Sequence, residues 1–110
     1  MKLHNGDASI VEIEKLRDYC LSPAHPRGRH KARVFKALLE MTAADAEEFR
    51  NALMKAAKNK DATLGISDQY GVRYTIDFEL SRGDRTAAIR SCWIVKSGEI
   101  FPRFVTCFIL

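Results

Sequence analysis

Residues 72–80 alternate between apolar and polar side chains, and this alternation constrains the fold more than any other feature of the sequence. Successive side chains of a β-strand point to opposite faces, so the pattern predicts a strand with one buried and one solvent-facing side. Shorter runs separated by turn-like sequences predict three more strands, at residues 62–66, 86–95 and 101–109. The last two carry apolar residues on both sides, which leaves their faces unassigned. Hairpin-length connections make the predicted sheet an antiparallel meander.

The N-terminal half has a helical period instead. Apolar residues in segment 9–21 recur with helical spacing, and a proline follows that segment. A second helix is predicted over residues 29–41, and a third from about residue 43 to 58, with Thr42 and Asp45 placed as in a capping box. The predicted buried stripe of the second helix is Val34, Phe35, Leu38 and Met41. The predicted fold is therefore α+β, with about three N-terminal helices packed on one face of a four-stranded antiparallel β-meander.

The length of 110 residues and the apolar content of 46% are those of one globular domain. We predict a single domain over residues 10–110 and an N-terminal extension over residues 1–9. No apolar run approaches the roughly 18 residues that a membrane helix needs, and the first residues lack an apolar signal segment. A cytoplasmic location without a membrane partner is therefore expected.

The three cysteines are scattered through apolar patterns and do not have the spacing of metal ligands. No metal site and no cofactor is expected. Two interpretations of the thiols stay open, reduced core residues or a reactive group. The cysteines are Cys20, Cys92 and Cys107.

Lys31 occupies the core-facing side of the second helix, because it precedes Val34 and Phe35 by three and four residues. Its place in the first helical turn is unfavourable for a cation, since the helix dipole is positive there. Either its stem packs over the edge of the core or its ammonium has a function. His30 flanks the same stripe. His25 lies in the preceding loop and is either a turn residue or a proton carrier.

The predicted sheet contributes a second polar set. Arg90, Arg103 and Thr106 interrupt runs of small or apolar residues. The two arginines are either exposed-face charges or cations that stabilise a phosphate, and Thr106 is a good strand former that needs no function. Trp93 is either a core residue or an aromatic platform that binds substrate.

These candidates are cationic or hydroxyl-bearing and include no carboxylate pair. Magnesium-dependent nucleases require acidic ligands, whereas Asp77 and Glu79 belong to an ordinary exposed strand face. Cleavage of RNA without metal needs a base for the 2′-hydroxyl, an acid for the leaving oxygen and a cation for the phosphorane charge. His, Lys and Arg can fill these roles, and the net charge of +4 is compatible with binding to phosphates.

Residues 25–35 read His-Pro-Arg-Gly-Arg-His-Lys-Ala-Arg-Val-Phe. In this run the chain resembles a bacterial family of uncharacterised domains whose members carry His-Pro-x-Gly-x-x-Lys-Ala-x-x-Phe. The resemblance covers about residues 10–107, and the family's members are sometimes encoded beside antitoxin-like frames. The other matching stretches are Tyr70-Gly71-x-x-Tyr74, Arg85-Thr86-Ala87-x-Ile89-Arg90, Trp93-Ile94-Val95 and Pro102-Arg103-Phe104-Val105-Thr106.

In layout the chain also resembles the superfamily of metal-independent RNases that includes barnase, RelE and colicin toxins. Sites in that superfamily pair His, Lys or Arg from a helix or its preceding loop with Arg and Ser/Thr from the sheet. Matched residue by residue, the resemblance implies catalytic roles for His25, Lys31, Arg90 and Thr106, with Arg103 as a phosphate contact. We add His30 and Trp93 as candidate substrate-binding residues.

The resulting hypothesis is a metal-independent endoribonuclease, a bacterial toxin that leaves 2′,3′-cyclic phosphate ends on RNA and has a cognate antitoxin or immunity protein. The alternative is a non-catalytic binding module, such as an immunity, antitoxin or phage-associated protein, that uses its sheet face for a protein partner. An enzyme acting on a small anionic metabolite would need a deep pocket. In a catalyst Lys31, Arg90 and Thr106 should converge, whereas in a binding module they should point to different faces.

Overall fold

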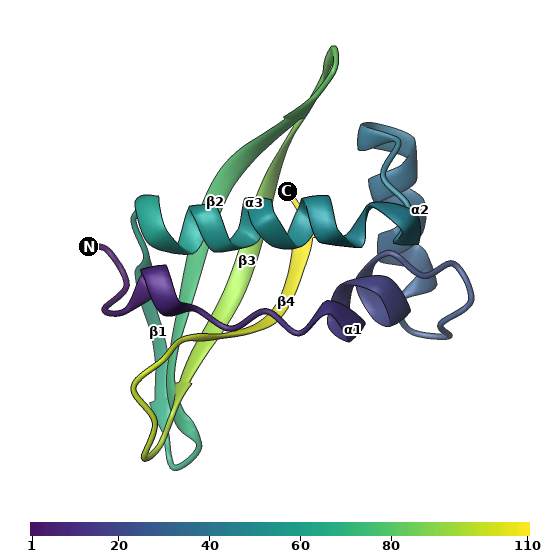
Figure 1. Cartoon of the computed structure of the whole chain (residues 1–110). Coiled ribbons are helices and arrows are strands. Elements are labelled where there is room, and N and C mark those ends of the chain that lie inside the picture. Colours follow the sequence, from purple (N-terminus) through teal and green to yellow (C-terminus); the bar gives the residue numbers. More distant parts are fainter.

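The computed structural model describes all 110 residues and shows an antiparallel four-stranded sheet preceded in the chain by helices (Figure 1). Each strand pairs with its neighbour along the chain, in the order β1-β2-β3-β4. The strands are β1 Thr63–Asp68, β2 Gly71–Arg82, β3 Arg85–Lys96 and β4 Arg103–Ile109. The predicted α+β class and the β-meander are therefore confirmed, with strand ends that differ from the predicted ones by a few residues.

The three α-helices are α1 Ile13–Lys15, α2 Arg29–Leu39 and α3 Ala46–Asn59. α1 continues into a π-helical turn, Leu16–Cys20, so the first helix is shorter than the segment 9–21 suggested. Its predicted N-terminal part is extended, because the N–H of Ile10 bonds to Pro102 at 2.8 Å and its carbonyl accepts from Phe104 at 2.9 Å. These bonds hold the chain along the start of β4 instead of in a helix.

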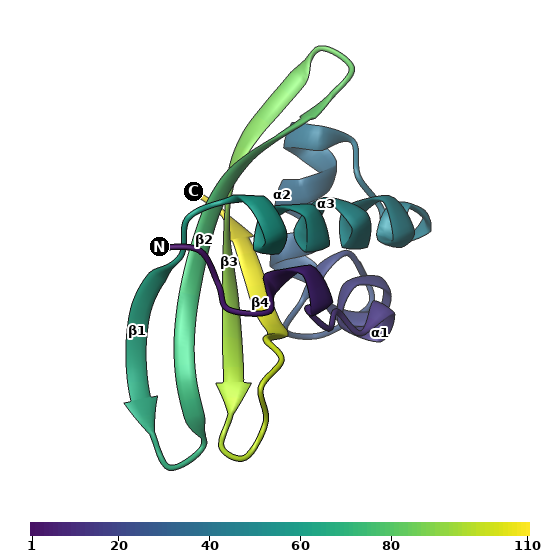
Figure 2. The same ribbon diagram turned by 60° about the vertical axis from the view of Figure 1, so that its left-hand side comes forward.

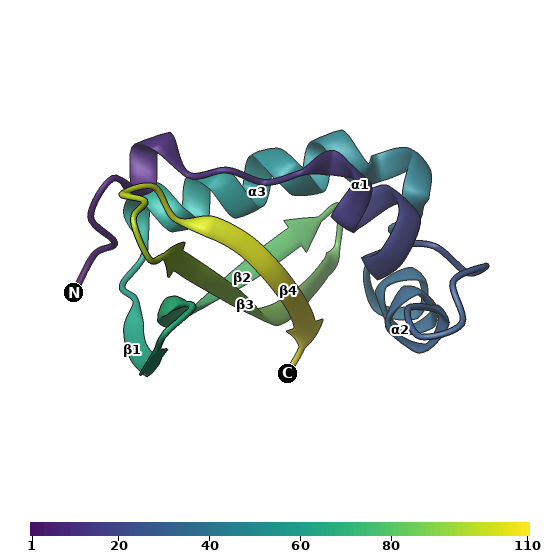
Figure 3. The ribbon, with the colours of Figure 1, turned by 90° about the horizontal axis from the view of Figure 1, so that it is seen from below.

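α3 lies across one face of the sheet, and α2 stands beside the β4 edge (Figures 2 and 3). The opposite face of the sheet has no helix lying across it (Figure 3). The core between the sheet and the helices is one cluster of 21 buried residues, whose largest fully buried members include Trp93, Phe35, Phe49 and Phe104. One sheet face is thus left open, and α2 borders it. No helix is both long and apolar enough to cross a membrane.

The first nine residues, predicted as an extension, pack against the rest of the chain. Leu3 is buried and belongs to the core cluster. Gly6 is also buried, against the C-terminal part of α3, where a Cβ atom would collide with the carbonyl of Ala57. Lys2 forms an isolated antiparallel bridge with Asp61. This segment therefore contributes to the packed structure.

The predicted stripe of the second helix is confirmed in part, since Phe35 and Met41 are buried but Val34 and Leu38 are not. Ala32, Phe35 and Leu39 are buried, whereas Val34 and Leu38 are 42% and 47% exposed. The difference follows from the place of α2 beside the edge of the sheet, where only a narrow side of the helix meets β3, β4 and the π-helical turn. The exposed apolar residues of α2 consequently lie at the surface next to the open sheet face.

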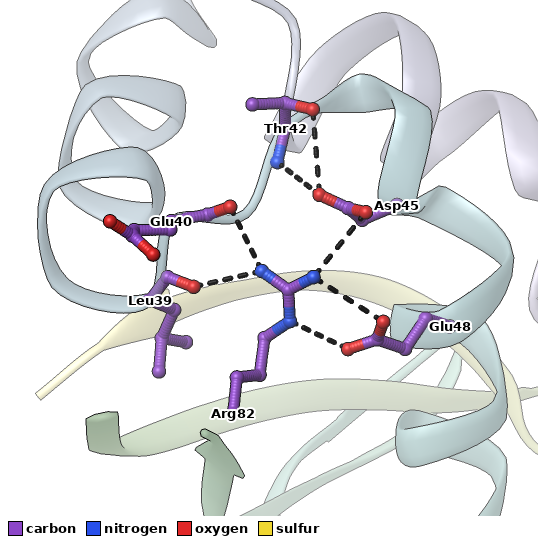
Figure 4. Close-up of polar contacts among 6 residues, drawn as sticks. All are labelled: Leu39, Glu40, Thr42, Asp45, Glu48 and Arg82. Atoms are coloured by element: carbon purple, nitrogen blue, oxygen red, sulfur yellow. Dashed lines mark hydrogen bonds and ion pairs between the residues drawn. The ribbon is translucent and has the colours of Figure 1, made fainter. Parts of the chain in front are cut away.

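Arg82, at the end of β2, ties the sheet to the junction between α2 and α3 (Figure 4). Its Nη1 donates to the carbonyls of Leu39 and Glu40 at 2.8 and 2.9 Å. Its Nε donates to Glu48 at 2.6 Å, and its Nη2 lies 3.3 Å from Asp45. α2 ends there because Glu40 adopts a left-handed conformation with φ of 53°. The guanidinium thus satisfies carbonyls that the helix end leaves free.

Replacing Arg82 with methionine should lower the free energy of unfolding by about 2 kcal/mol, because two carbonyls and two carboxylates lose their donor at once. Urea denaturation measures this change. Arg17→Met is the matched control, since Arg17 pairs only with its neighbour Asp18 at the surface and should change stability by less than about 0.5 kcal/mol. Equal stabilities of the two variants would contradict the bridging role of Arg82.

Candidate functional site

A lysine from α2 meets a threonine from β4. The Nζ of Lys31 donates a hydrogen bond to the Oγ1 of Thr106 at 2.7 Å, across 75 residues of sequence. The same ammonium lies 5.6 Å from the ring centroid of Tyr19 and 6.0 Å from that of Phe108. None of the ion pairs in the structure includes Lys31. The half-buried Lys31 therefore presents a cation whose charge no carboxylate neutralises.

A β-bulge in β4 directs Thr106 toward this lysine. Trp93 pairs with Phe104, but the preceding residue Cys92 pairs with Thr106, so Val105 is an extra residue in β4. In a regular strand residues 104 and 106 would share a face. The bulge places Phe104 in the core and Thr106 beside Cys92 on the open face. This irregularity is the reason why the sequence pattern did not assign the faces of the last strand.

Arg90 lies on the same open face. It pairs in register with Phe108, two positions from the pair formed by Cys92 and Thr106. Its Nε and Nη2 both donate to the carboxylate of Asp77 at 2.8 Å. These hydrogen bonds lower the pKa of Asp77 and raise the pKa of Arg90. Arg90 is thus held in a fixed orientation by a bidentate ion pair.

Cys92 lies opposite Thr106 in the register of the sheet, two residues after Arg90. Burial raises the pKa of the Cys92 thiol, and the positive charges of Lys31 and Arg90 both oppose that rise. Both cations therefore act on the same group. We call Lys31, Arg90, Cys92 and Thr106 the cationic cluster. Of the four residues predicted as catalytic, the structure brings Lys31 and Thr106 into contact and places Arg90 on the same sheet face, with its guanidinium on Asp77. Their chemical roles stay predictions.

His25 stabilises the loop that leads into α2. Its Nδ1 accepts hydrogen bonds from the backbone N–H groups of Arg27 and Gly28, each at 3.0 Å. Because Nδ1 is an acceptor here, the proton of the neutral ring lies on Nε2. The imidazole packs edge-on against Tyr19, with ring centroids 4.7 Å apart. Tyr19 therefore lies in contact range of both His25 and Lys31, which do not bond to each other.

Gly28 has a steric role in the same loop. A Cβ atom at this position would overlap the backbone carbonyl oxygen of Tyr19. The tight contact lets the loop fold back onto the π-helical turn, so that His25 reaches the backbone N–H groups just before α2. The spacing of His25 and Gly28 in the sequence motif is thereby explained by local geometry.

Gly28→Ala should reduce the free energy of unfolding by about 1–3 kcal/mol, because the backbone must shift to accommodate the methyl group. Chemical denaturation followed by circular dichroism measures the loss. Arg27→Ala removes an exposed side chain from the same loop and should stay within about 0.5 kcal/mol of the wild type. A Gly28→Ala protein as stable as Arg27→Ala would show that the close approach to Tyr19 is unimportant.

The remaining candidates lie apart from the cationic cluster or at its edge. Arg103 donates to both carboxylate oxygens of Glu99, at 2.9 and 3.0 Å, and lies 3.9 Å from Glu12. His30 is exposed and borders Lys31 in a cleft beside Phe108.

Trp93 has no solvent exposure and donates its Nε1 proton to Ser91 at 2.9 Å. In this structure Trp93 is a core residue, the first of its two predicted roles.

Two further thiols lie in the core. Cys20 and Cys107 are buried and free. Their mutual hydrogen bond, together with burial, raises the pKa of Cys107, whereas that bond lowers the pKa of Cys20. Both are core residues, as one of the two interpretations of the cysteines predicts. Tyr19 and Phe108, the two aromatic residues nearest the Lys31 ammonium, were not among the predicted site residues. Their only sequence signal was that each is an aromatic residue in a segment that contacts Lys31.

These features define a small α+β domain with a cationic cluster on an open sheet face. Residues 2–110 match the family described as "Domain of unknown function (DUF6883)", and the chain belongs to that family. This membership agrees with the predicted resemblance to a family of uncharacterised domains. No curated protein matches the chain.

One solved structure has a similar fold. It is described as a contact-dependent growth inhibition toxin–immunity protein complex from Klebsiella pneumoniae 342. The chains superpose with a TM-score of 0.67 at 16% sequence identity, over 92% of this chain and 99% of that chain. At this identity the likeness shows a shared fold.

Proposed function

We propose that the chain is a metal-independent endoribonuclease that acts as a bacterial toxin. The contact between Lys31 and Thr106, beside Arg90 on an open face, carries this proposal. An ammonium without a carboxylate partner, a hydroxyl and an oriented guanidinium form a suitable binding site for an RNA phosphate. The similar chain in a toxin–immunity complex supports the biological setting, with a cognate immunity protein or antitoxin as partner.

The reaction requires two proton transfers. A base takes the proton of the 2′-hydroxyl, whose oxygen attacks the neighbouring phosphorus. An acid returns a proton to the 5′ oxygen as the bond from phosphorus to that oxygen breaks, which leaves a 2′,3′-cyclic phosphate and a 5′-hydroxyl. Lys31 and His25 are the two proton carriers, Arg90 stabilises the phosphorane charge and Thr106 orients the phosphate.

A second candidate function is a non-catalytic binding module. The observation in its favour is that carboxylates already pair with both sheet arginines, Arg90 with Asp77 and Arg103 with Glu99. In this function the open sheet face holds a protein partner. Growth and cleavage assays separate the two candidates, because only an endoribonuclease arrests growth by cutting RNA.

Two assays test this proposal. In the first, the chain is expressed in bacteria from a tightly controlled promoter and growth is followed. In the second, the purified protein is incubated with cellular RNA in the presence of EDTA. The expected results are growth arrest and RNA fragments whose 3′ ends are cyclic phosphates, identified by their resistance to alkaline phosphatase until acid opens the ring. Harmless expression together with intact RNA would overturn the endoribonuclease and favour the binding module.

A further inference from the structure

A small cleft opens between α2 and the end of β4, directly beside Lys31. Its volume is about 220 Å³, below the roughly 300–1,000 Å³ typical of sites for drug-sized ligands. A cleft of this size suits one planar ring system. It is lined by His30, Lys31, Val34, Phe35, Phe108 and Ile109.

Phe108 forms the aromatic wall of this cleft. It is 39% exposed, on the open face and opposite Arg90 in the register of the sheet. On the other wall Val34 is 42% exposed. Two partly exposed apolar side chains from different elements therefore face solvent at the same place.

The cleft is continuous with the cationic cluster. The Nζ of Lys31 is 6.0 Å from the centroid of the Phe108 ring and 2.7 Å from Thr106. An anion bound at Lys31 would consequently be next to an aromatic surface. Nucleotides combine these two properties, because each phosphate is joined through a sugar to a flat base that stacks on aromatic side chains.

We infer that this cleft binds one unpaired nucleobase of the RNA, stacked on Phe108, while the adjoining phosphate lies at Lys31 and Arg90. The inference rests on the proposed endoribonuclease function and narrows its substrate to single-stranded or looped RNA, since a base must leave its helix to enter the cleft. The walls are mostly apolar, so stacking rather than hydrogen bonding holds the base. Discrimination among the four bases is correspondingly weak.

Phe108→Ala tests this inference with a binding readout that is independent of catalysis. The probe is a single-stranded oligoribonucleotide with 2′-O-methyl groups, which cannot be cleaved through its 2′ oxygen. Loss of the stacked contact should raise its Kd by about 10-fold, and Phe108→Tyr should restore binding. Phe101→Ala is the matched control, because Phe101 is 41% exposed but does not line the cleft, and its Kd should stay within about 2-fold of the wild type.

Val34→Met gives a second test if Phe108→Ala is poorly folded, because the longer aliphatic side chain fills part of the cleft from the exposed side of α2 without adding a ring on which a base could stack. It should weaken binding of the single-stranded probe in the same way. If the wild type cleaves RNA but both variants bind the probe like Phe101→Ala, the cleft inference is wrong and the endoribonuclease stands. If the wild type neither cleaves RNA nor binds the probe, the proposed function itself is wrong.

Discussion

Replacing Lys31 with methionine should lower the rate of RNA cleavage by about 100-fold or more and relieve growth arrest. Removal of a single preorganised donor from a site of developing negative charge typically has an effect of this size. Methionine preserves much of the apolar stem between Tyr19 and Phe108, so the loss is assigned to the ammonium rather than to packing. Single-turnover cleavage of a fluorescent oligoribonucleotide measures the rate.

Lys31→Arg separates charge from proton transfer. Arginine keeps the positive charge but does not deprotonate in proteins, so it can bind the phosphate without exchanging a proton. We expect this variant to bind RNA nearly as well as the wild type and to remain impaired in cleavage. Lys36→Met is the control for a lost charge on α2, since Lys36 is exposed and does not line the cleft beside Phe108. Cleavage by Lys31→Met within about 3-fold of the Lys36→Met rate would exclude a catalytic Lys31.

The sheet could be predicted from the sequence because the alternation of apolar and polar residues that indicates a strand is contained within a few consecutive residues. Alternation over residues 72–80 identifies β2, whose polar side faces solvent at Asp77 and Glu79 and whose apolar side is buried at Ile76 and Phe78. The faces of β4 were not predictable, since one extra residue at Val105 reverses the alternation between its two ends. A bulge leaves no signature in residue composition.

The candidate site was predictable only in part. Helical spacing places Lys31 on the buried side of α2, but its contact with Thr106 joins residues 75 positions apart. Only the resemblance to metal-independent RNases suggested that pairing. The ion pair between Arg90 and Asp77 depends on the register of β2 against β3, which the amino-acid pattern does not determine.

The orientation of α2 was not predictable for a related reason. Its apolar residues form a wide stripe that allows more than one buried side. Contacts with β3, β4 and the π-helical turn select Phe35 and Leu39, and leave Val34 and Leu38 exposed. The bonds from Arg82 to the end of this helix are also long-range, so no local pattern identifies that arginine. Helix placement thus depends on tertiary contacts, and the cleft beside Phe108 is a consequence of it.

Trp93→Ala should lower the free energy of unfolding by about 3–5 kcal/mol, because the indole is fully buried and its removal leaves a large cavity. The ring packs edge-on against Phe104 with centroids 5.6 Å apart, and its Nε1 bonds to the buried Ser91. A loss of this size is a large fraction of the stability of a typical small domain. Urea denaturation followed by circular dichroism measures it.

Trp93→Phe distinguishes a core role from a substrate-binding role. Phenylalanine fills most of the cavity and loses the bond to Ser91, so stability should fall by only about 1–2 kcal/mol. The folded variant should bind the non-cleavable oligoribonucleotide within about 2-fold of the wild type, because the ring at position 93 faces the core and the base is expected at Phe108 on the other side of the sheet. Weaker RNA binding by a fully folded Trp93→Phe protein would place this residue in the substrate site and contradict its role as a core residue.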